Sequence, residues 1–166
     1  NCVQWITQPS MEATSALMNH EGIATILATG GNAMVKAAYS CGKPALGVGA
    51  GNVPAYVEKS ANIRQAAHDI VMSKSFDNGM VCASEQAVII DKEVYDEFVE
   101  EFKSYHTYFV NKKEKALLEE FCFGAKANSK NCAGAKLNPD IVGKPATWIA
   151  EQAGFSVPED TNILAA

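Results

Sequence analysis

The chain has 166 residues and a formal net charge of −5, from 14 Lys and Arg against 19 Asp and Glu. Hydrophobic residues make up 48% and charged residues 20%, a composition typical of a folded chain with one good core or two small lobes. The negative balance disfavours a nucleic-acid surface. No apolar run reaches the roughly 20 residues that a membrane-spanning helix needs.

The cysteines and histidines argue against a disulfide scaffold and against a metal site. The cysteines are widely spaced and contain no C-x-x-C pair: Cys2, Cys41, Cys82, Cys122 and Cys132. The histidines lie too far apart for a local metal motif. Free thiols are typical of a reducing compartment, so we expect a cytoplasmic protein without bound metal in this chain.

The first third of the chain alternates strand and helix patterns with short connections. Short apolar runs predict buried strands over residues 3–6, 23–28, 45–49 and 55–58. Helical patterns cover residues 10–19, with Ser10 as the N-cap, and 33–40. Strands and helices that alternate in this way are typical of a parallel, doubly wound sheet, so the predicted fold class is α/β.

The rest of the chain continues the α/β pattern. Helices are predicted over residues 61–74, 91–105 (capped by Asp91), 111–123 and 145–154, and strands over 87–90 and 162–165. Phe98 and Phe102 share one side of their helix and are predicted to be core. Residues 124–139, rich in Ala, Asn, Lys and Gly, are predicted to form a loop.

Cys82 lies in an irregular stretch, residues 75–86, between a helical pattern and a strand pattern. Asn78 and Gly79 are typical turn formers within it. A cysteine on such a turn can be exposed beside a free backbone N–H, and an acyl-forming thiol needs both features. The alternative is a buried cysteine that acts as a small hydrophobic residue.

Two glycine-rich segments are candidates for cofactor binding. Thr29-Gly30-Gly31 follows a buried strand and opens a helix, where free N–H groups and the absence of a side chain suit a pyrophosphate. The segment lacks the full G-x-G-x-x-G spacing, so a plain tight turn is the alternative. Residues 47–52, GVGAGN, are the second segment, and left-handed backbone angles are its alternative explanation.

Residues 76–86, FDNGMVCASEQ, resemble the catalytic-cysteine segment of CoA-acylating aldehyde dehydrogenases. Within that family, the resemblance is to the aldehyde dehydrogenase half of the bacterial bifunctional aldehyde-alcohol dehydrogenases. Residues 26–31 and 47–52 resemble the cofactor-side motifs of the same family, in the same order. The resemblance covers essentially the whole chain. It implies an aldehyde dehydrogenase-like fold, with the C-terminal half of an NAD-binding domain over residues 1–57 and an incomplete, cysteine-bearing catalytic domain over 58–166.

The resemblance also implies the chemistry. Cys82 would be the catalytic nucleophile, NAD the cofactor and coenzyme A the co-substrate. The implied cofactor contacts are Thr29, Gly30, Gly31, Val48 and Gly49. Hydrolytic relatives carry a glutamate base where this chain has Gly47, so an acyl group on the cysteine would survive until a second thiol arrives. The implied reaction converts acetaldehyde, CoA and NAD into acetyl-CoA and NADH, reversibly.

Wider expectations follow from the same resemblance. The chain is expected to be an inactive internal piece of a longer enzyme of fermentative ethanol metabolism, which forms a homo-oligomer or filament. Iron is expected only in an alcohol dehydrogenase half that this chain does not contain. Two alternatives stay open, namely a stand-alone acylating dehydrogenase for a longer aldehyde and a non-catalytic fragment that serves assembly or interaction.

Overall fold

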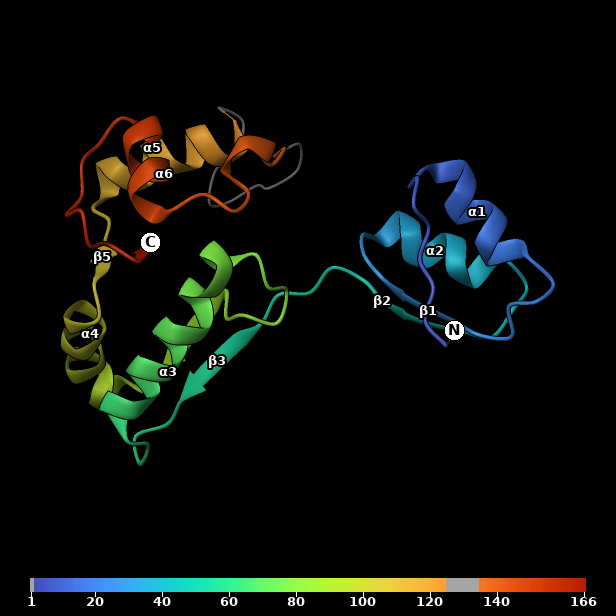
Figure 1. Cartoon of the computed structure of the whole chain (residues 1–166). Coiled ribbons are helices and arrows are strands. Elements are labelled where there is room, and N and C mark those ends of the chain that lie inside the picture. The colour runs from blue at the N-terminus through green and yellow to red at the C-terminus, as the bar shows by residue number, and fades with distance from the viewer. Residues whose placement is uncertain (1, 125–134) are drawn as a thin grey trace. The chain divides into compact units, whose positions relative to one another are not determined.

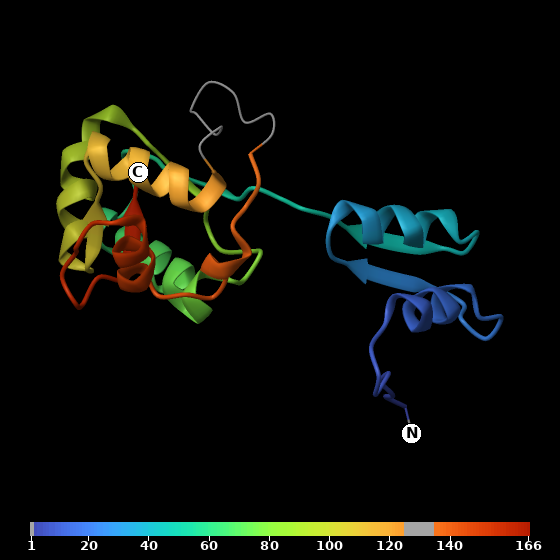
Figure 2. The same cartoon turned by 90° about the horizontal axis from the view of Figure 1, so that it is seen from above.

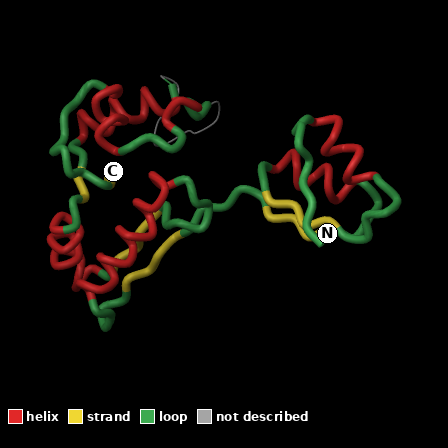
Figure 3. Tube along the Cα trace, viewed as in Figure 1, coloured by secondary structure: helices red, strands yellow, loops and turns green. Residues whose placement is uncertain are grey.

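Helices and strands alternate along the chain, as the ribbon and the tube both show (Figures 1 and 3). The structure is a computed structural model that describes residues 2–124 and 135–166. It divides into two units, Asn1–Gly51 and Asn52–Ala166. All three strand pairs are parallel, which confirms the predicted α/β class.

The first unit is a parallel strand pair covered on one face by two helices. Strands β1 (Ile26–Thr29) and β2 (Ala45–Val48) pair along their whole length. Helices α1 (Met11–Asn19) and α2 (Asn32–Ser40) lie on the same side of these strands (Figure 1). The buried residues of this unit are Ile26, Ala28 and Ala38, with Met18, Ile23, Cys41 and Ala45 packed around them. Small alanines at the centre let α2 approach the strands closely.

The second unit contains two more parallel strand pairs. Strand β3 (Pro54–Val57) pairs with β4 (Ala87–Ile90), and β5 (Thr107–Phe109) pairs with β6 (Ile163–Ala165). Its helices are α3 (Ile63–Ser75), α4 (Tyr95–Ser104), α5 (Lys112–Phe123) and α6 (Ala146–Ala153). Short 3-10 turns cover Phe76–Gly79, Lys92–Val94 and Pro139–Ile141. Helices α5 and α6 lie side by side (Figures 1 and 2).

The core of the second unit lies between α3, α4 and the β3–β4 pair. One stripe of α3 is buried: Ile63, Ala67, Ile70 and Val71. Phe98 and Phe102 of α4 pack against it, with their ring centroids 4.7 Å apart, and Phe98 is 1% exposed. Burial of one such side chain stabilises the fold by about 1.5–3 kcal/mol. Both predicted aromatic core residues are therefore confirmed.

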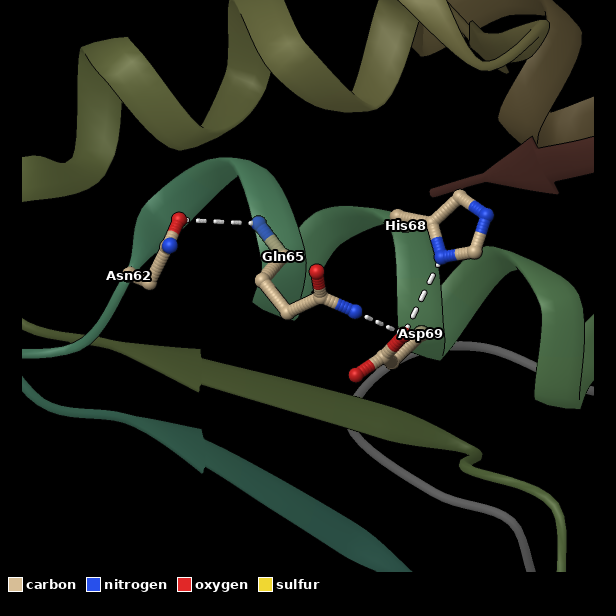
Figure 4. A network of polar contacts seen from close by, with 4 residues as sticks. All are labelled: Asn62, Gln65, His68 and Asp69. Carbon is tan, nitrogen blue, oxygen red and sulfur yellow. Dashed lines mark hydrogen bonds and ion pairs between the residues drawn. The ribbon is translucent and has the colours of Figure 1, made fainter.

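The outer face of α3 is held by polar contacts close to the helix start (Figure 4). The Asn62 side chain accepts the Gln65 backbone N–H at 3.1 Å and caps the helix. The Asp69 carboxylate accepts from Gln65 Nε2 at 2.7 Å and lies 3.0 Å from His68 Nδ1. The hydrogen bond with His68 lowers the pKa of the Asp69 carboxyl. These contacts lie opposite the buried stripe and serve the helix itself.

Several predicted elements differ from those observed. Residues 3–6 form no strand, because Val3 and Trp5 are each 80% exposed and no described strand pairs with them. The sequence analysis did not predict β5, a three-residue strand between two helices. Residues 125–134, which make up most of the predicted loop over 124–139, lie outside the described residues, as does Cys132. The division into an NAD-binding domain over 1–57 and a catalytic domain over 58–166 stays a prediction.

Asp91 is the N-cap residue of the 3-10 turn Lys92–Val94, but its side chain makes no capping hydrogen bond, so the predicted cap of a helix over residues 91–105 is confirmed in position only. Its carboxylate accepts the Tyr56 O–H at 2.6 Å and the Lys59 backbone N–H at 3.0 Å, which ties the end of β4 to the end of β3. The hydrogen bond from Tyr56, followed by that from the Lys59 N–H, lowers the pKa of the Asp91 carboxyl. Both partners lie more than 30 residues away in sequence, so the local pattern carried no sign of them.

The hydrogen bond between Tyr56 and Asp91 leads to a prediction about the effect of pH. Because the pKa of Asp91 is lower in the folded state, its stabilising contribution is present above the unfolded pKa and is lost as the pH falls through the folded pKa. Tyr56→Phe should therefore reduce amide-exchange protection of Lys59 at neutral pH, and the difference from the unmodified protein should vanish in acid. Tyr95→Phe, at an exposed tyrosine, is the control. An equal loss of protection at every pH would contradict the expectation.

Candidate active site

Cys82 is exposed on the connection between α3 and β4. After α3 ends at Ser75, Asp77, Asn78 and Gly79 have φ angles of 51°, 50° and 74°. This left-handed region is open to glycine and is tolerated by Asp and Asn more readily than by other residues. The predicted turn-forming role of Asn78-Gly79 is therefore confirmed, and this reversal brings Cys82 to the surface.

A second, tighter turn encloses Cys82. The Ser84 backbone N–H donates to the Val81 carbonyl oxygen at 3.0 Å, and the Ser84 hydroxyl donates to the same oxygen at 2.8 Å. Ser84 is 1% exposed. Within the described part of the chain, the Cys82 backbone N–H has no acceptor. An exposed sulfur beside a free N–H is the arrangement that an acyl-forming thiol needs.

Longer-range hydrogen bonds fasten both ends of this connection. Asn78 Nδ2 donates to the Gly143 carbonyl oxygen at 2.9 Å. At the other end, the Gln86 backbone N–H donates to the Val53 carbonyl at 2.8 Å, and the Val53 N–H donates to Gln86 Oε1 at 2.9 Å. The loop that carries Cys82 is therefore held to a chain segment on each side.

Two charged residues lie close to the turn. Glu85 Oε2 is buried without a hydrogen-bond partner among the described residues. Lys74, in the last turn of α3, lines the same cavity of about 540 Å³ and donates from Nζ to the Ser84 hydroxyl oxygen at 3.3 Å. Lys74 was not among the candidate site residues predicted from the sequence. Its place at the end of the helix that leads to Cys82 is the one sequence signal that could have drawn attention to it.

The other cysteines that the structure describes differ from Cys82 in exposure, in contacts or in their place on the chain. Cys122 is buried, and burial raises the pKa of its thiol. Cys41 is half-buried against the core of the first unit and donates to the Ala38 carbonyl at 3.0 Å. Cys2 is exposed, but it lies on a segment without regular structure.

The structure brings the first glycine-rich segment next to Val48. Thr29 is the last residue of β1, and the Gly30 N–H donates to the Val48 carbonyl at 3.1 Å. Gly31 is the N-cap residue of α2 and has no side chain that could cap the helix. A Cβ atom at Gly31 would meet nothing within 4 Å. Open space and free N–H groups at the start of a nine-residue helix are compatible with a bound phosphate group.

Two glycines of the second glycine-rich segment, Gly47 and Gly49, lie close to α2. Gly47, Gly49 and Gly51 all lack positive φ angles, so left-handed backbone geometry is not the reason for them. A Cβ atom at Gly49 would lie 3.0 Å from Asn32 Oδ1, at the start of α2. Gly49 therefore lies beside the helix start that Gly31 caps. The roles of these glycines, of Thr29, of Val48 and of Cys82 stay predictions.

Gly47 has no room for a side chain. A Cβ atom there would lie 2.6 Å from Val35 Cγ1 and 2.8 Å from Tyr39 Cε2, and the Gly47 N–H donates to the Tyr39 hydroxyl at 2.9 Å. Real Cβ atoms essentially never come so close to neighbouring atoms. Glycine at this position therefore lets α2 pack against β2.

Two further properties bear on the kind of site. Over residues 2–124 and 135–166, no three His, Cys, Asp or Glu side chains gather where they could hold a metal ion. Within the same described ranges, every helix is too short or too polar to cross a membrane.

The chain is thus a parallel α/β protein with an exposed cysteine on the turn between a helix and a strand, where a thiol nucleophile could act. The model of the aldehyde dehydrogenase family matches residues 1–136, and the chain belongs to that family. Over all 166 residues it is 96% identical to the aldehyde-alcohol dehydrogenase of Streptococcus pneumoniae serotype 4, of which it spans 19%.

Solved structures agree with this assignment. An acetylating aldehyde dehydrogenase from Geobacillus thermoglucosidasius matches 96% of this chain with a TM-score of 0.83 and 46% identity, over 33% of its own length. A Rhodopseudomonas palustris propionaldehyde dehydrogenase with bound propionyl-CoA matches 95% with a TM-score of 0.81 and 36% identity, also over 33% of its length. The predicted resemblance and the predicted fold are confirmed.

Proposed function

We propose that this chain carries the nucleophile of an NAD-dependent, CoA-acylating acetaldehyde dehydrogenase within a bifunctional aldehyde-alcohol dehydrogenase. The observation that carries the proposal is the exposed Cys82, whose backbone N–H has no acceptor among the described residues. The near-identity to an aldehyde-alcohol dehydrogenase over the whole chain supports it. Because the chain spans 19% of that relative, the activity is proposed for the full-length polypeptide.

The geometry suggests what Cys82 does in this reaction. Its thiolate attacks the aldehyde carbonyl carbon, and the Cys82 N–H donates to the oxyanion of the resulting thiohemiacetal. Bound NAD supplies the acceptor for the hydride that leaves this carbon. The acyl group then remains on the Cys82 sulfur as a thioester, until the thiol of CoA attacks the carbonyl carbon and releases Cys82.

The proposed cofactor site lies at the start of α2. Thr29, Gly30 and Gly31 lead into the helix, and Val48 ends the neighbouring strand β2, with Gly49 directly after it. The open space at Gly31 and the helix N-terminus support contact with the NAD phosphates. The absence of a carboxylate at Gly47 supports transfer of the acyl group to CoA rather than to water.

A longer aldehyde is the second candidate substrate. The 36% identity to a propionaldehyde dehydrogenase favours keeping it open. Comparing acetaldehyde with propanal, butanal and succinic semialdehyde in one NADH assay separates the two. A cytoplasmic location and assembly into a homo-oligomer or filament remain predictions from the resemblance. Iron in an alcohol dehydrogenase half remains such a prediction as well.

The test is NADH formation by the purified full-length polypeptide with acetaldehyde, in the presence and absence of CoA. Its intact mass is measured on the same sample. We expect a chain several times larger than this one and NADH formation that depends on CoA. Equal NADH formation without CoA would overturn the acylating assignment in favour of hydrolysis. No NADH formation under either condition would favour an assembly role.

A further inference from the structure

The Lys74 side chain contacts the turn that carries Cys82. Lys74 lies in the last turn of α3, is half-buried, and donates from Nζ to the hydroxyl oxygen of Ser84 at 3.3 Å. A Cβ atom at Gly79 would lie 3.4 Å from Lys74 Cε and 3.5 Å from Nζ. The lysine side chain therefore runs close to the backbone of Gly79 and ends at Ser84.

Ser84 links Lys74 to the turn by hydrogen bonds. Its hydroxyl accepts from Lys74 and donates its own proton to the Val81 carbonyl at 2.8 Å, while its backbone N–H donates to the same carbonyl at 3.0 Å. Cys82 and Ala83 are the two residues that this turn encloses. The hydroxyl proton of an isolated serine can rotate among several acceptors, and a cationic donor on its lone pair directs that proton to Val81.

We propose that Lys74 is a positioning residue for Cys82, which acts through the Ser84 hydroxyl to fix the backbone of residues 81–84. This inference rests on the proposed function of Cys82. The backbone N–H of Cys82 and its Cα–Cβ bond both belong to that turn. The conformation of the turn therefore sets the direction of the sulfur and of the N–H that donates to the oxyanion. Lys74 touches neither reacting group, so its effect is on geometry.

Three features make the contact specific. Ser84 is 1% exposed, so its hydroxyl depends on protein partners rather than on water. Gly79 lies alongside the lysine stem, which a Cβ atom at residue 79 would meet at van der Waals distance. The ammonium group also lies near the C-terminal end of α3, where the helix dipole favours a positive charge. Glu85 lines the same cavity of about 540 Å³ as Lys74, and its Oε2 has no hydrogen-bond partner among the described residues.

The test uses two variants at Lys74 in the full-length polypeptide. Lys74→Met keeps the length of the stem but removes the donor, and Lys74→Arg keeps a charged donor. We expect Lys74→Met to lower kcat for CoA-dependent NADH formation by about 10- to 100-fold, the cost of a misplaced reacting group. KM for NAD and for CoA should stay within about twofold, and Lys74→Arg should recover part of kcat. Lys92→Met, at an exposed lysine of the same unit, is the control.

Ser84→Ala tests the same contact from the other side. If Lys74 acts through Ser84, the double variant should lose no more kcat than the more damaged single variant. Additive losses, or a Lys74→Met variant with unchanged kcat, would overturn the proposal. Amide-exchange protection of Ser84 should fall in Lys74→Met, and this readout needs no catalytic activity. It therefore tests the contact even if Cys82 proves not to be the nucleophile.

Discussion

Cys82→Ala in the full-length polypeptide is expected to abolish CoA-dependent NADH formation. Removal of the nucleophile from an enzyme that uses covalent catalysis lowers kcat by on the order of 10⁶-fold. Alanine keeps the Cβ atom and leaves the turn from Val81 to Ser84 intact, because that turn is closed by bonds in which the thiol takes no part. The expected loss is therefore chemical, and NAD binding and thermal stability should change little.

Cys2→Ala is the matched control, because Cys2 is the other cysteine that the structure describes as exposed. It should retain full activity. A thioester trapped from labelled acetaldehyde and NAD, in the absence of CoA, should be found on the peptide that contains Cys82. Activity of Cys82→Ala within tenfold of the unmodified enzyme would contradict the assignment of the nucleophile.

The parts of the fold that sequence predicted well are those determined by neighbouring residues. The bounds of β4 were predicted to the residue, and the α3 stripe followed from the helical spacing of its apolar residues. Asn78-Gly79 predicted the turn before Cys82, because few other residues tolerate left-handed backbone angles. Local chemistry thus predicted a cysteine on a turn between a helix and a strand, with an exposed and a buried thiol as the two alternatives, and the structure shows the exposed one.

What sequence could not predict depends on contacts between distant segments. Asp91 fits a helix cap by position, yet Tyr56 and Lys59 take its carboxylate. The contact of Lys74 with Ser84 exists only because the chain reverses between them. An apolar run such as residues 3–6 becomes a strand only beside a partner strand, and none of the described strands pairs with it. In each case the structure depends on a contact with a distant segment, which the local sequence pattern does not reveal.

The glycine at position 47 has a structural explanation as well as a chemical one. The resemblance accounts for Gly47 as the position where hydrolytic relatives carry a glutamate base. On this backbone, however, a side chain at residue 47 would be directed at Val35 and Tyr39 of α2. Gly47→Glu is therefore expected to destabilise the first unit. Overpacking of this kind costs about 1–3 kcal/mol.

Gly47→Ala separates packing from charge, since a single methyl group already meets both neighbours. It should lower amide-exchange protection in β1 and β2 by about 10- to 100-fold, the equivalent of that cost. Gly51→Ala, where a Cβ atom meets nothing within 4 Å, should have almost no effect. If Gly47→Ala instead keeps its protection, the methyl group must fit between Val35 and Tyr39. Close packing would then not explain the glycine.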